Sequence, residues 1–270
     1  GILESVGCRC RFQGSRLSID ASRVIKTAIP QEDVKKMRSS ILVMGALLGR
    51  TGEAAAWYPG GCSIGSRPVD LHLLAFSRLG AGVEEEEGRI RARGRLRGGE
   101  IVFPFPSVGA TENALLAAVL APGETVIFGA AREPEIITLC QLLRQMGAVI
   151  AGEGTERIQI KGVSRLFETE YAVPGDRIAA GTYLAAVTAA GGQAVLWGAP
   201  WESMGAVTET LCRCGACIEP LPDEGGRILG ARILMEGRPR PVRLQTGPYP
   251  EFPTDLQSPM LAVLSLAEGE

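Results

Sequence analysis

Residues 59–72 contain the side chain best suited to covalent chemistry, Cys62, which lies among three glycines. Glycines on both sides of a cysteine favour an exposed loop over a packed core. Arg67, five residues after the cysteine, can favour the thiolate form, which is a nucleophile. A free surface cysteine on a turn would have the same local sequence, so these residues alone leave a reactive and an inert cysteine equally open.

Two further segments carry residues that could bind an anion. Ser107, Val108 and Gly109 come just before a predicted helix, where free backbone N–H groups and the helix dipole suit a phosphate. Helix capping explains Ser107 and Thr111 equally well, and on these residues alone it is the favoured interpretation. Arg38 could bind a phosphate through two hydrogen bonds, although a solvated helix start explains it too.

Asp255 is the candidate general base. It follows Phe252, Pro253 and Thr254 at the start of a predicted helix. An acid in the first helical turn usually stabilises the helix through its dipole. A buried carboxylate at the same place could instead accept a proton from a substrate.

The cluster of Cys212, Cys214 and Cys217 has a spacing that invites a metal or redox interpretation. The internal repeat described next places Cys214 and Cys217 where another copy has a leucine and a glycine, which favours core or strand positions. His72 is the single histidine, so a Cys/His zinc site would have few ligands. The sequence therefore predicts no metal site.

The elements that must position these residues occur in copies. Glycine signatures recur at Gly7, Gly80, Gly147 and Gly215, separated by 73, 67 and 68 residues. Each is followed by an alternating stretch typical of strands, at 16–19, 88–92, 156–160 and 232–235.

Two kinds of helix lie between these strands. An Ala- and Leu-rich helix ending near glycine is predicted over 39–50, 112–120, 179–190 and 259–267, with Thr111 and Thr254 as N-cap candidates. A second helix, such as 134–146 or 201–213, precedes the glycine signature. Each unit of about 70 residues therefore predicts strand, helix, strand, helix and two strands, with the helix layers packed together.

Composition excludes several classes of protein. The chain has 270 residues, of which 46% are apolar and 21% charged, with a net charge of −2. This excludes a disordered chain and argues against a nucleic-acid partner. The longest apolar run, 114–121, is far shorter than the roughly 20 residues that span a bilayer. Seven cysteines without a secretion signal predict a soluble protein of the reducing cytoplasm, with no membrane partner.

One charged stretch needs a separate interpretation. Glu84 to Glu87 are followed by arginines at every second position from Arg89 to Arg97. Such a run could form a charged patch that binds a ligand. Alternation is also what one solvated face of a strand looks like, and we favour that interpretation.

Taken together, these motifs resemble those of the UDP-N-acetylglucosamine 1-carboxyvinyltransferase family. They occur in the family's order and near the family's spacing, and the resemblance runs from Ile2 to Glu270. The sister family, 5-enolpyruvylshikimate-3-phosphate synthase, shares the repeated architecture but lacks the cysteine loop. The matching segments are 36–42, 59–72, 107–113, 131–136, 174–178 and 252–257.

The resemblance implies an α/β (α+β) fold of two domains, each an inside-out α/β barrel of three repeated units with the substrate cleft between the domains. Residues 1–174 would form most of the first domain and residues 175–270 the beginning of the second. The family transfers the enolpyruvyl group of phosphoenolpyruvate to the 3′-hydroxyl of UDP-N-acetylglucosamine, the first committed step of peptidoglycan synthesis. It releases phosphate, passes through a tetrahedral ketal and uses no cofactor.

Two residues of this chain match the family's catalytic positions. Cys62 matches the loop cysteine that gives a proton to phosphoenolpyruvate, can form a covalent adduct with it and is alkylated by fosfomycin. Asp255 matches the carboxylate that orients and deprotonates the attacking hydroxyl. These roles suit the chemistry, because a sugar hydroxyl is a weak nucleophile that gains from a positioned base.

Ten further positions match the family's substrate-binding residues. Arg67 matches an arginine that contacts phosphate and the sugar nucleotide, and Ser107 to Gly109 match the loop that holds the diphosphate. Phe105 departs from the pattern, since some members carry a lysine there. The full set is Arg38, Arg67, Pro68, Val69, Asp70, Leu71, Ser107, Val108, Gly109 and Thr254.

A second hypothesis is a non-catalytic piece of the same enzyme that retains partial nucleotide-sugar binding. The family's Lys-Asn pair near the start and its late aspartate and arginine, which hold phosphoenolpyruvate, have no counterpart in this sequence. Each lost charged contact costs about 2 kcal/mol or more. On this hypothesis the chain ends are truncation points and the 270 residues release no phosphate. Turnover that disappears in Cys62→Ala would contradict it.

Overall fold

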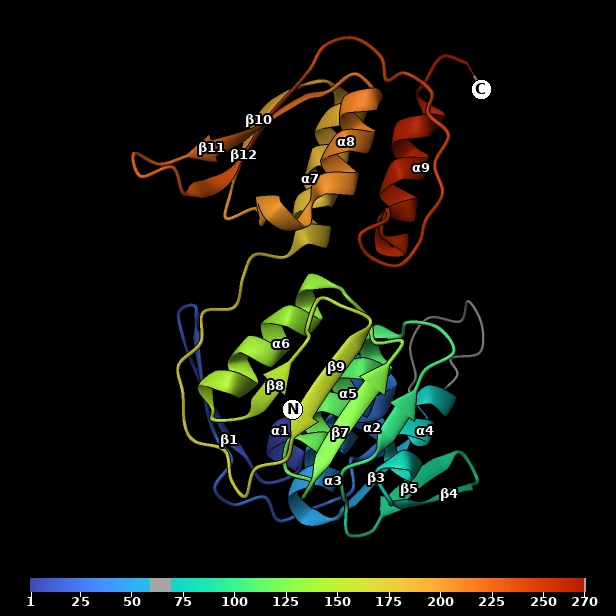
Figure 1. The fold of residues 1–270 in the computed structure, drawn as a ribbon. Coiled ribbons are helices and arrows are strands. Elements are labelled where there is room, and N and C mark those ends of the chain that lie inside the picture. The colour runs from blue at the N-terminus through green and yellow to red at the C-terminus, as the bar shows by residue number, and fades with distance from the viewer. Residues whose placement is uncertain (59–68, 270) are drawn as a thin grey trace. The chain divides into compact units, whose positions relative to one another are not determined.

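The computed structural model describes residues 1–58 and 69–269, and for Lys36 and Arg38 it describes the backbone only. The chain divides into two compact units, Gly1–Glu170 and Tyr171–Glu270 (Figure 1). Each unit has its own hydrophobic core, formed within residues 6–160 in the first and within residues 180–263 in the second. The division falls close to the boundary after Pro174 that the resemblance implies.

The first unit follows the predicted repeat of strands and helices. The strands expected at 16–19, 88–92 and 156–160 are confirmed as β2, β5 and β9. The elements are α1 (Ile2–Ser5), β1 (Arg9–Gln13), β2 (Arg16–Asp20), α2 (Gln31–Lys36), the 3-10 helix η1 (Arg38–Ile41), α3 (Leu42–Thr51), β3 (Glu53–Trp57), α4 (Asp70–Arg78), β4 (Gly82–Glu86), β5 (Arg89–Arg93), β6 (Glu100–Val102), α5 (Val108–Ala118), β7 (Glu124–Phe128), α6 (Pro134–Gln145), β8 (Val149–Ala151) and β9 (Arg157–Lys161).

The strands of this unit form three sheets. Strands β1 and β2 pair alone, a second sheet has the order β3-β5-β4, and a third has the order β6-β7-β9-β8. Only β6 and β7 pair in parallel among these strands of the described chain; the other pairs are antiparallel. Strand β9 alternates exposed and buried residues, with Ile158 and Ile160 inside, as expected of a sheet with one solvated face.

The helices α3 and α5 form the centre of the first unit. Seven of the 11 residues of α5 are buried, so this helix is enclosed rather than amphipathic. It packs against α3 through glycine, since a Cβ on Gly45 would lie 2.5 Å from Asn113 Oδ1 and one on Gly49 would lie 3.0 Å from the carbonyl oxygen of Ala117. Strands β7 and β9 run side by side across α5 (Figure 1). Inner helices with sheets outside them are the arrangement that the resemblance implies.

The second unit repeats the pattern with a smaller sheet. Its sheet has the order β10-β12-β11, all antiparallel, and α7 packs on it as well as on α8 and α9. The elements are α7 (Arg177–Ala190), β10 (Gly192–Trp197), the 3-10 helix η2 (Trp201–Ser203), α8 (Gly205–Arg213), β11 (Cys217–Pro222), β12 (Ile228–Met235), the 3-10 helix η3 (Thr254–Leu256) and α9 (Gln257–Ser265).

The capping role favoured for Ser107 is confirmed, whereas the N-caps predicted at Thr111 and Thr254 were wrong. The helix α5 begins at Val108, and its cap is Ser107, whose hydroxyl accepts a hydrogen bond from the N–H of Ala110 at 3.4 Å. Thr111 lies inside the helix, and its hydroxyl accepts the N–H of Ala131 at 3.1 Å. Thr254 begins the 3-10 helix η3 instead of capping α9.

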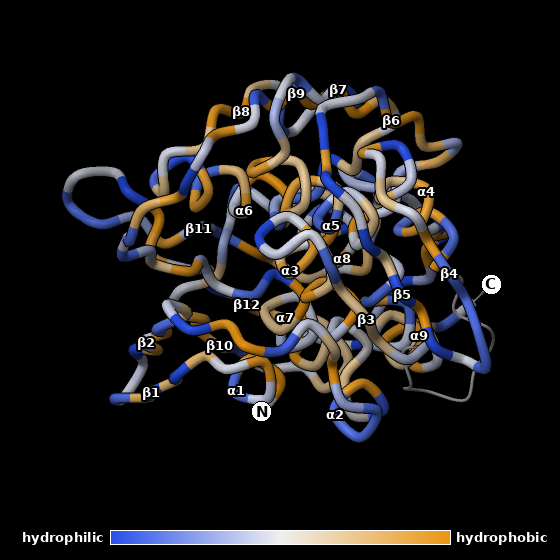
Figure 2. Tube along the Cα trace, turned by 90° about the horizontal axis from the view of Figure 1, so that it is seen from below, coloured by the Kyte–Doolittle hydropathy of each residue, from blue (hydrophilic) through white to orange (hydrophobic). Residues whose placement is uncertain are grey.

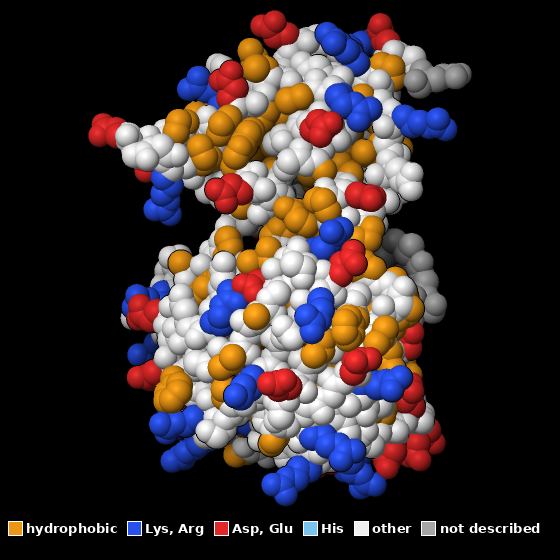
Figure 3. Space-filling view, in the orientation of Figure 1, with side chains coloured by type: hydrophobic (Ala, Val, Ile, Leu, Met, Phe, Trp, Pro, Cys, Tyr) orange, Lys and Arg blue, Asp and Glu red, His pale blue; other side chains and the backbone are white. Residues whose placement is uncertain are grey.

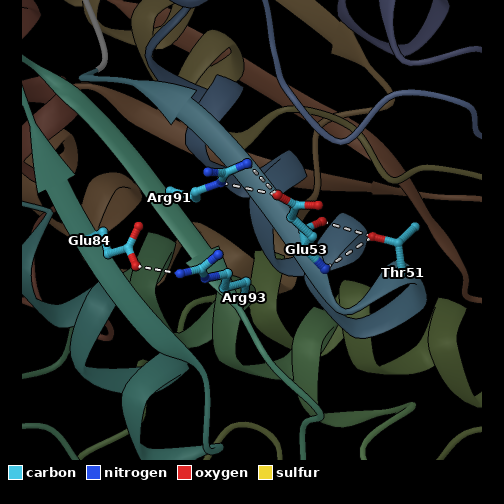
Figure 4. Close-up of polar contacts among 5 residues, drawn as sticks. All are labelled: Thr51, Glu53, Glu84, Arg91 and Arg93. Carbon is cyan, nitrogen blue, oxygen red and sulfur yellow. Dashed lines mark hydrogen bonds and ion pairs between the residues drawn. The ribbon is translucent and has the colours of Figure 1, made fainter.

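The alternating arginines form a solvated strand face, as we favoured. Arg91 pairs with Glu53 and Arg93 pairs with Glu84, each with a nitrogen–oxygen distance of 2.9 Å (Figure 4). The Thr51 hydroxyl donates to the carbonyl oxygen of Glu53 at 2.8 Å and ends α3 beside this face. Because these pairs are exposed, they add little to stability. On the face in Figure 3, basic and acidic side chains of the first unit are interspersed.

The turns between β4 and β5 and between β11 and β12 are hydrophilic (Figure 2). Cys214 is fully buried in the core of the second unit and Cys217 opens β11, as the repeat predicted. Within the described residues, no group of three or more His, Cys, Asp or Glu side chains could hold a metal ion. Across the same residues, no helix is both long enough and apolar enough to cross a membrane.

Candidate functional site

Three of the predicted site residues, Cys62, Arg67 and Pro68, lie outside the described residues. Their segment follows β3 in the sequence and precedes α4, which begins at Asp70. The described site therefore consists of what surrounds this segment in the sequence and of the helix starts that carry the remaining predicted residues.

The start of α4 separates its predicted residues into two kinds. Asp70 is exposed in the first turn of the helix. Val69 and Leu71 are 4% and 7% exposed and belong to the core of the first unit. A ligand at this helix start would meet the Asp70 carboxylate and only the backbone of its two neighbours.

The start of α5 has the geometry of an anion site. Ser107 caps the helix with its hydroxyl, and its carbonyl oxygen accepts the N–H of Thr111 at 3.0 Å. The amides of Val108 and Gly109 precede the first intrahelical donor, so the helix itself gives them no acceptor. Both residues are half-buried. Capping and anion binding thus use different groups of the same turn, and the two interpretations of this segment are compatible.

A buried polar network joins α5 to three other helices, η1, α3 and α4. The Oδ1 atom of Asn113 in α5 accepts the N–H of Gly45 in α3 at 2.9 Å, and its Nδ2 atom donates to the carbonyl oxygen of Ile41 in η1 at 3.0 Å. The same Nδ2 lies 2.8 Å from Nδ1 of His72 in α4. Analysis of the sequence missed this network, although an asparagine inside an Ala- and Leu-rich helix and a single histidine were signals that could have found it.

Glu112, next to Asn113 on α5, is a half-buried carboxyl whose pKa is strongly raised. Burial and, to a lesser degree, the negative charges of Glu135 and Glu133 together raise the pKa of Glu112 to about 7. This carboxyl therefore changes its charge near neutral pH.

The buried cysteines of the described chain are poor nucleophiles. Burial raises the pKa of Cys140 to about 12 and also raises the pKa of Cys8 and Cys214. Because the thiolate is the reactive form, these three thiols are unreactive at neutral pH.

In the second unit, Thr254 and Asp255 lie in η3. Both side chains are exposed, so the burial that would favour Asp255 as a base is absent within this unit. Leu256 anchors the turn, since it is 1% exposed and a Cβ on Gly181 of α7 would lie 2.5 Å from its Cδ1. The turn is thus held in place while its carboxylate points away from the core.

A cavity of about 700 Å³ lies in the second unit between α7 and β10. Its walls are mainly alanine, valine and glycine, and none of the predicted site residues lines it. Hydrophobic side chains gather on this side of the sheet (Figure 3), where Val195 and Trp197 are exposed. The cavity and the predicted site are therefore different places.

Known proteins with similar sequences cover nearly the whole of this chain. The UDP-N-acetylglucosamine 1-carboxyvinyltransferase of Novosphingobium aromaticivorans is 46% identical over 273 residues, which cover 100% of this chain and 62% of that protein. The enzyme of the same name from Zymomonas mobilis is 48% identical over 259 residues, covering 95% of this chain and 59% of that protein. The chain thus spans about 60% of the length of these curated relatives.

Solved structures share the fold. The enolpyruvyl transferase NikO from Streptomyces tendae superposes with a TM-score of 0.82 at 20% identity, over 99% of this chain and 63% of that one. An EPSP synthase from Acinetobacter baumannii gives a TM-score of 0.63 at 19% identity, over 90% and 57%. The sequence model of the family described as EPSP synthase (3-phosphoshikimate 1-carboxyvinyltransferase) matches residues 2–270. Because that match extends over almost every residue, the chain belongs to this family of carboxyvinyl transferases.

Proposed function

We propose that this protein transfers the enolpyruvyl group of phosphoenolpyruvate to the 3′-hydroxyl of UDP-N-acetylglucosamine and releases phosphate. The observation that carries the proposal is the 46% identity, over the whole chain, to a relative named for that reaction. The EPSP synthase structures are similar in fold at 19% and 20% identity. The sequence therefore favours a sugar nucleotide over a shikimate phosphate as the acceptor.

The start of α5 is suited to hold the diphosphate of the sugar nucleotide. The amides of Val108 and Gly109 and the positive end of the helix dipole favour a negative charge there. Arg38 and Arg67 supply full positive charges in this proposal, and Asp70 can accept hydrogen bonds from the uridine or the sugar. Pro68, Val69 and Leu71 contribute through their backbone.

The reaction is an addition followed by an elimination. The hydroxyl oxygen attacks C2 of phosphoenolpyruvate, Asp255 takes the hydroxyl proton, and the Cys62 thiol gives a proton to the methylene carbon C3. A tetrahedral ketal results. The Cys62 thiolate then takes a proton back from C3 as phosphate leaves C2 with the proton held by Asp255, which restores the double bond, now attached to the sugar, and regenerates both side chains. A positioned base and a positioned acid contribute typically 10²- to 10⁴-fold each, so the loss of either side chain is severe.

In the cell, this reaction would be the first committed step of peptidoglycan synthesis, carried out in the cytoplasm. Both substrates are anionic, and the proposed site meets their charge with arginines and helix amides rather than with a metal ion. Fosfomycin would inactivate the protein by opening its epoxide ring on the Cys62 sulfur.

Calorimetric titration distinguishes the two acceptor classes of the family. We expect UDP-N-acetylglucosamine to bind with saturable heat at one site per chain, and shikimate 3-phosphate to give none at the same concentrations. The matched control is UDP alone, which shares the diphosphate but lacks the sugar and should bind more weakly. Saturable binding of shikimate 3-phosphate without binding of the sugar nucleotide would contradict the proposal.

A further inference from the structure

The orientation of the Asn113 amide is fixed by two hydrogen bonds to backbone. Its Oδ1 atom must be the acceptor, because it faces the N–H of Gly45 at 2.9 Å. Its Nδ2 atom must be the donor, because it faces the carbonyl oxygen of Ile41 at 3.0 Å. Asn113 is fully buried, so no solvent competes for these bonds. The second hydrogen of Nδ2 then points to its remaining neighbour, His72.

This orientation determines the state of the His72 ring. An amide N–H at 2.8 Å from Nδ1 requires a lone pair on that nitrogen, so the ring proton is on Nε2. A ring protonated on Nδ1 would place two hydrogens against each other. The Nε2 side of the ring lies under the first turn of α5, since a Cβ on Gly109 would lie 3.1 Å from Cε1 and 3.5 Å from Nε2.

The pair therefore links three segments that carry predicted ligand residues. Asn113 belongs to α5, which begins with Ser107 as its cap, and His72 lies one half-turn after Asp70 in α4. The carbonyl that Asn113 holds is at the end of η1, the 3-10 helix that begins at Arg38. A buried polar network whose members are all hydrogen-bonded fixes one arrangement of the elements that it joins.

We propose that Asn113 and His72 are positioning residues of the sugar-nucleotide site, which hold the end of η1 and the starts of α4 and α5 in register through a neutral His72 ring protonated on Nε2. The inference rests on the proposed function for its ligand, but not for the state of the ring. His72 acts as an acceptor at Nδ1, so a side chain that keeps an acceptor at that place should preserve the site.

The state of the ring can be measured directly, because His72 is the only histidine in the chain. Protein labelled with ring-¹⁵N histidine should give one pair of ring nitrogen signals, with Nε2 protonated and Nδ1 unprotonated at pH 8. Titration with UDP-N-acetylglucosamine should shift these signals, and the dissociation constant fitted to the shifts should equal the one found by calorimetry. A ring protonated on Nδ1, or on both nitrogens, would overturn the inference whether or not the ligand binds.

Two matched variants test the positioning role. Asparagine can place an acceptor near the position of Nδ1, whereas phenylalanine fills the space of the ring without one. We expect His72→Phe to weaken sugar-nucleotide binding by at least about tenfold and His72→Asn by less than about threefold, because only the former leaves a buried amide hydrogen unpaired. Ile158→Val, in β9, is the control for a mild loss of core packing and should leave the affinity unchanged.

The outcomes separate this inference from the proposed function. If the unaltered chain does not bind UDP-N-acetylglucosamine, the proposed function fails and the positioning role fails with it. If the unaltered chain binds and both His72 variants bind equally well while remaining folded by circular dichroism, the proposed function stands and the inference is overturned. Loss of binding in His72→Phe with rescue in His72→Asn supports both.

Discussion

At the scale of single residues, α5 carries two neighbouring polar side chains in opposite situations. Asn113 is buried and satisfied by three partners, and its hydrogen bonds hold the helix starts together. Glu112 is half-buried, and its carboxyl sits near two other acids, Glu135 and Glu133. The first residue stabilises the fold at every pH at which the His72 ring is neutral, whereas the second makes stability depend on pH.

Glu112→Gln should change how stability depends on pH. Because the pKa of Glu112 is about 7 in the folded protein and near 4.5 when unfolded, the folded state holds the proton more tightly between these values. The stability that this proton provides is complete below pH 4.5 and is lost as the pH rises through 7. From pH 5 to pH 8 we expect the first unit of the unaltered protein to lose roughly 2 kcal/mol more unfolding free energy than the variant.

Urea denaturation at the two pH values measures this difference. The control is Glu124→Gln, at an exposed position at the start of β7, which should follow the unaltered protein. Equal pH dependence in Glu112→Gln and the unaltered protein would show that burial does not hold the proton on Glu112.

At the scale of elements, much of the fold could be predicted because it depends on local patterns. The strands β2, β5, β9 and β12 follow from alternation, α6 from apolar spacing and α7 from an Ala- and Leu-rich run that ends at glycine, so each was found within a few residues. Ser107 and Thr111 were both candidates for the cap of α5, and Ser107 is the cap, while the Thr111 hydroxyl accepts the N–H of Ala131 from inside the helix. The parallel pairing of β6 with β7 left no local signal.

The candidate site was predictable to the same degree. Residues at helix starts, such as Asp70 of α4 and Ser107 at the cap of α5, can be found from short motifs. Asn113 and His72 each stand out as a single polar residue in an apolar segment, but their contact has no local signal, because they are 41 residues apart. Only the packing of α3, α4 and α5 shows that they meet.

Gly45→Ala tests the close contact between α3 and α5. The added Cβ would lie 2.5 Å from Asn113 Oδ1 and 2.6 Å from the Asn113 carbonyl oxygen, so the helices must separate. We expect a loss of about 2 kcal/mol, which exceeds the gain in helix propensity of about 1 kcal/mol. Thermal unfolding measures it. Gly205→Ala in α8 is the matched control, since its Cβ meets nothing within 4 Å, and it should be neutral or slightly stabilising.

At the scale of the whole molecule, the two units have separate cores. No buried core residue of the first unit belongs to the core cluster of the second among the described residues. The three tryptophans divide between the units, with Trp57 in the first and Trp197 and Trp201 in the second. Fluorescence can therefore follow each unit by itself.

Trp57→Phe leaves fluorescence that reports the second unit, and the double variant Trp197→Phe, Trp201→Phe leaves fluorescence that reports the first. Because the first unit has the larger core, we expect it to unfold at a higher urea concentration than the second. Circular dichroism of the unaltered protein should then show both transitions. Coincident midpoints in the two variants would show that the chain unfolds as one cooperative body.

The central claim is that Cys62 is the reactive thiol of an enolpyruvyl transferase site, and fosfomycin labelling followed by peptide mapping tests it most directly. The chain has seven cysteines, so the position of the adduct carries the information. We expect one adduct, on the peptide that contains Cys62, absent from Cys62→Ala and unchanged in Cys217→Ala, whose exposed thiol is the control. An adduct on another cysteine, or none while iodoacetamide still labels Cys62, would contradict the account.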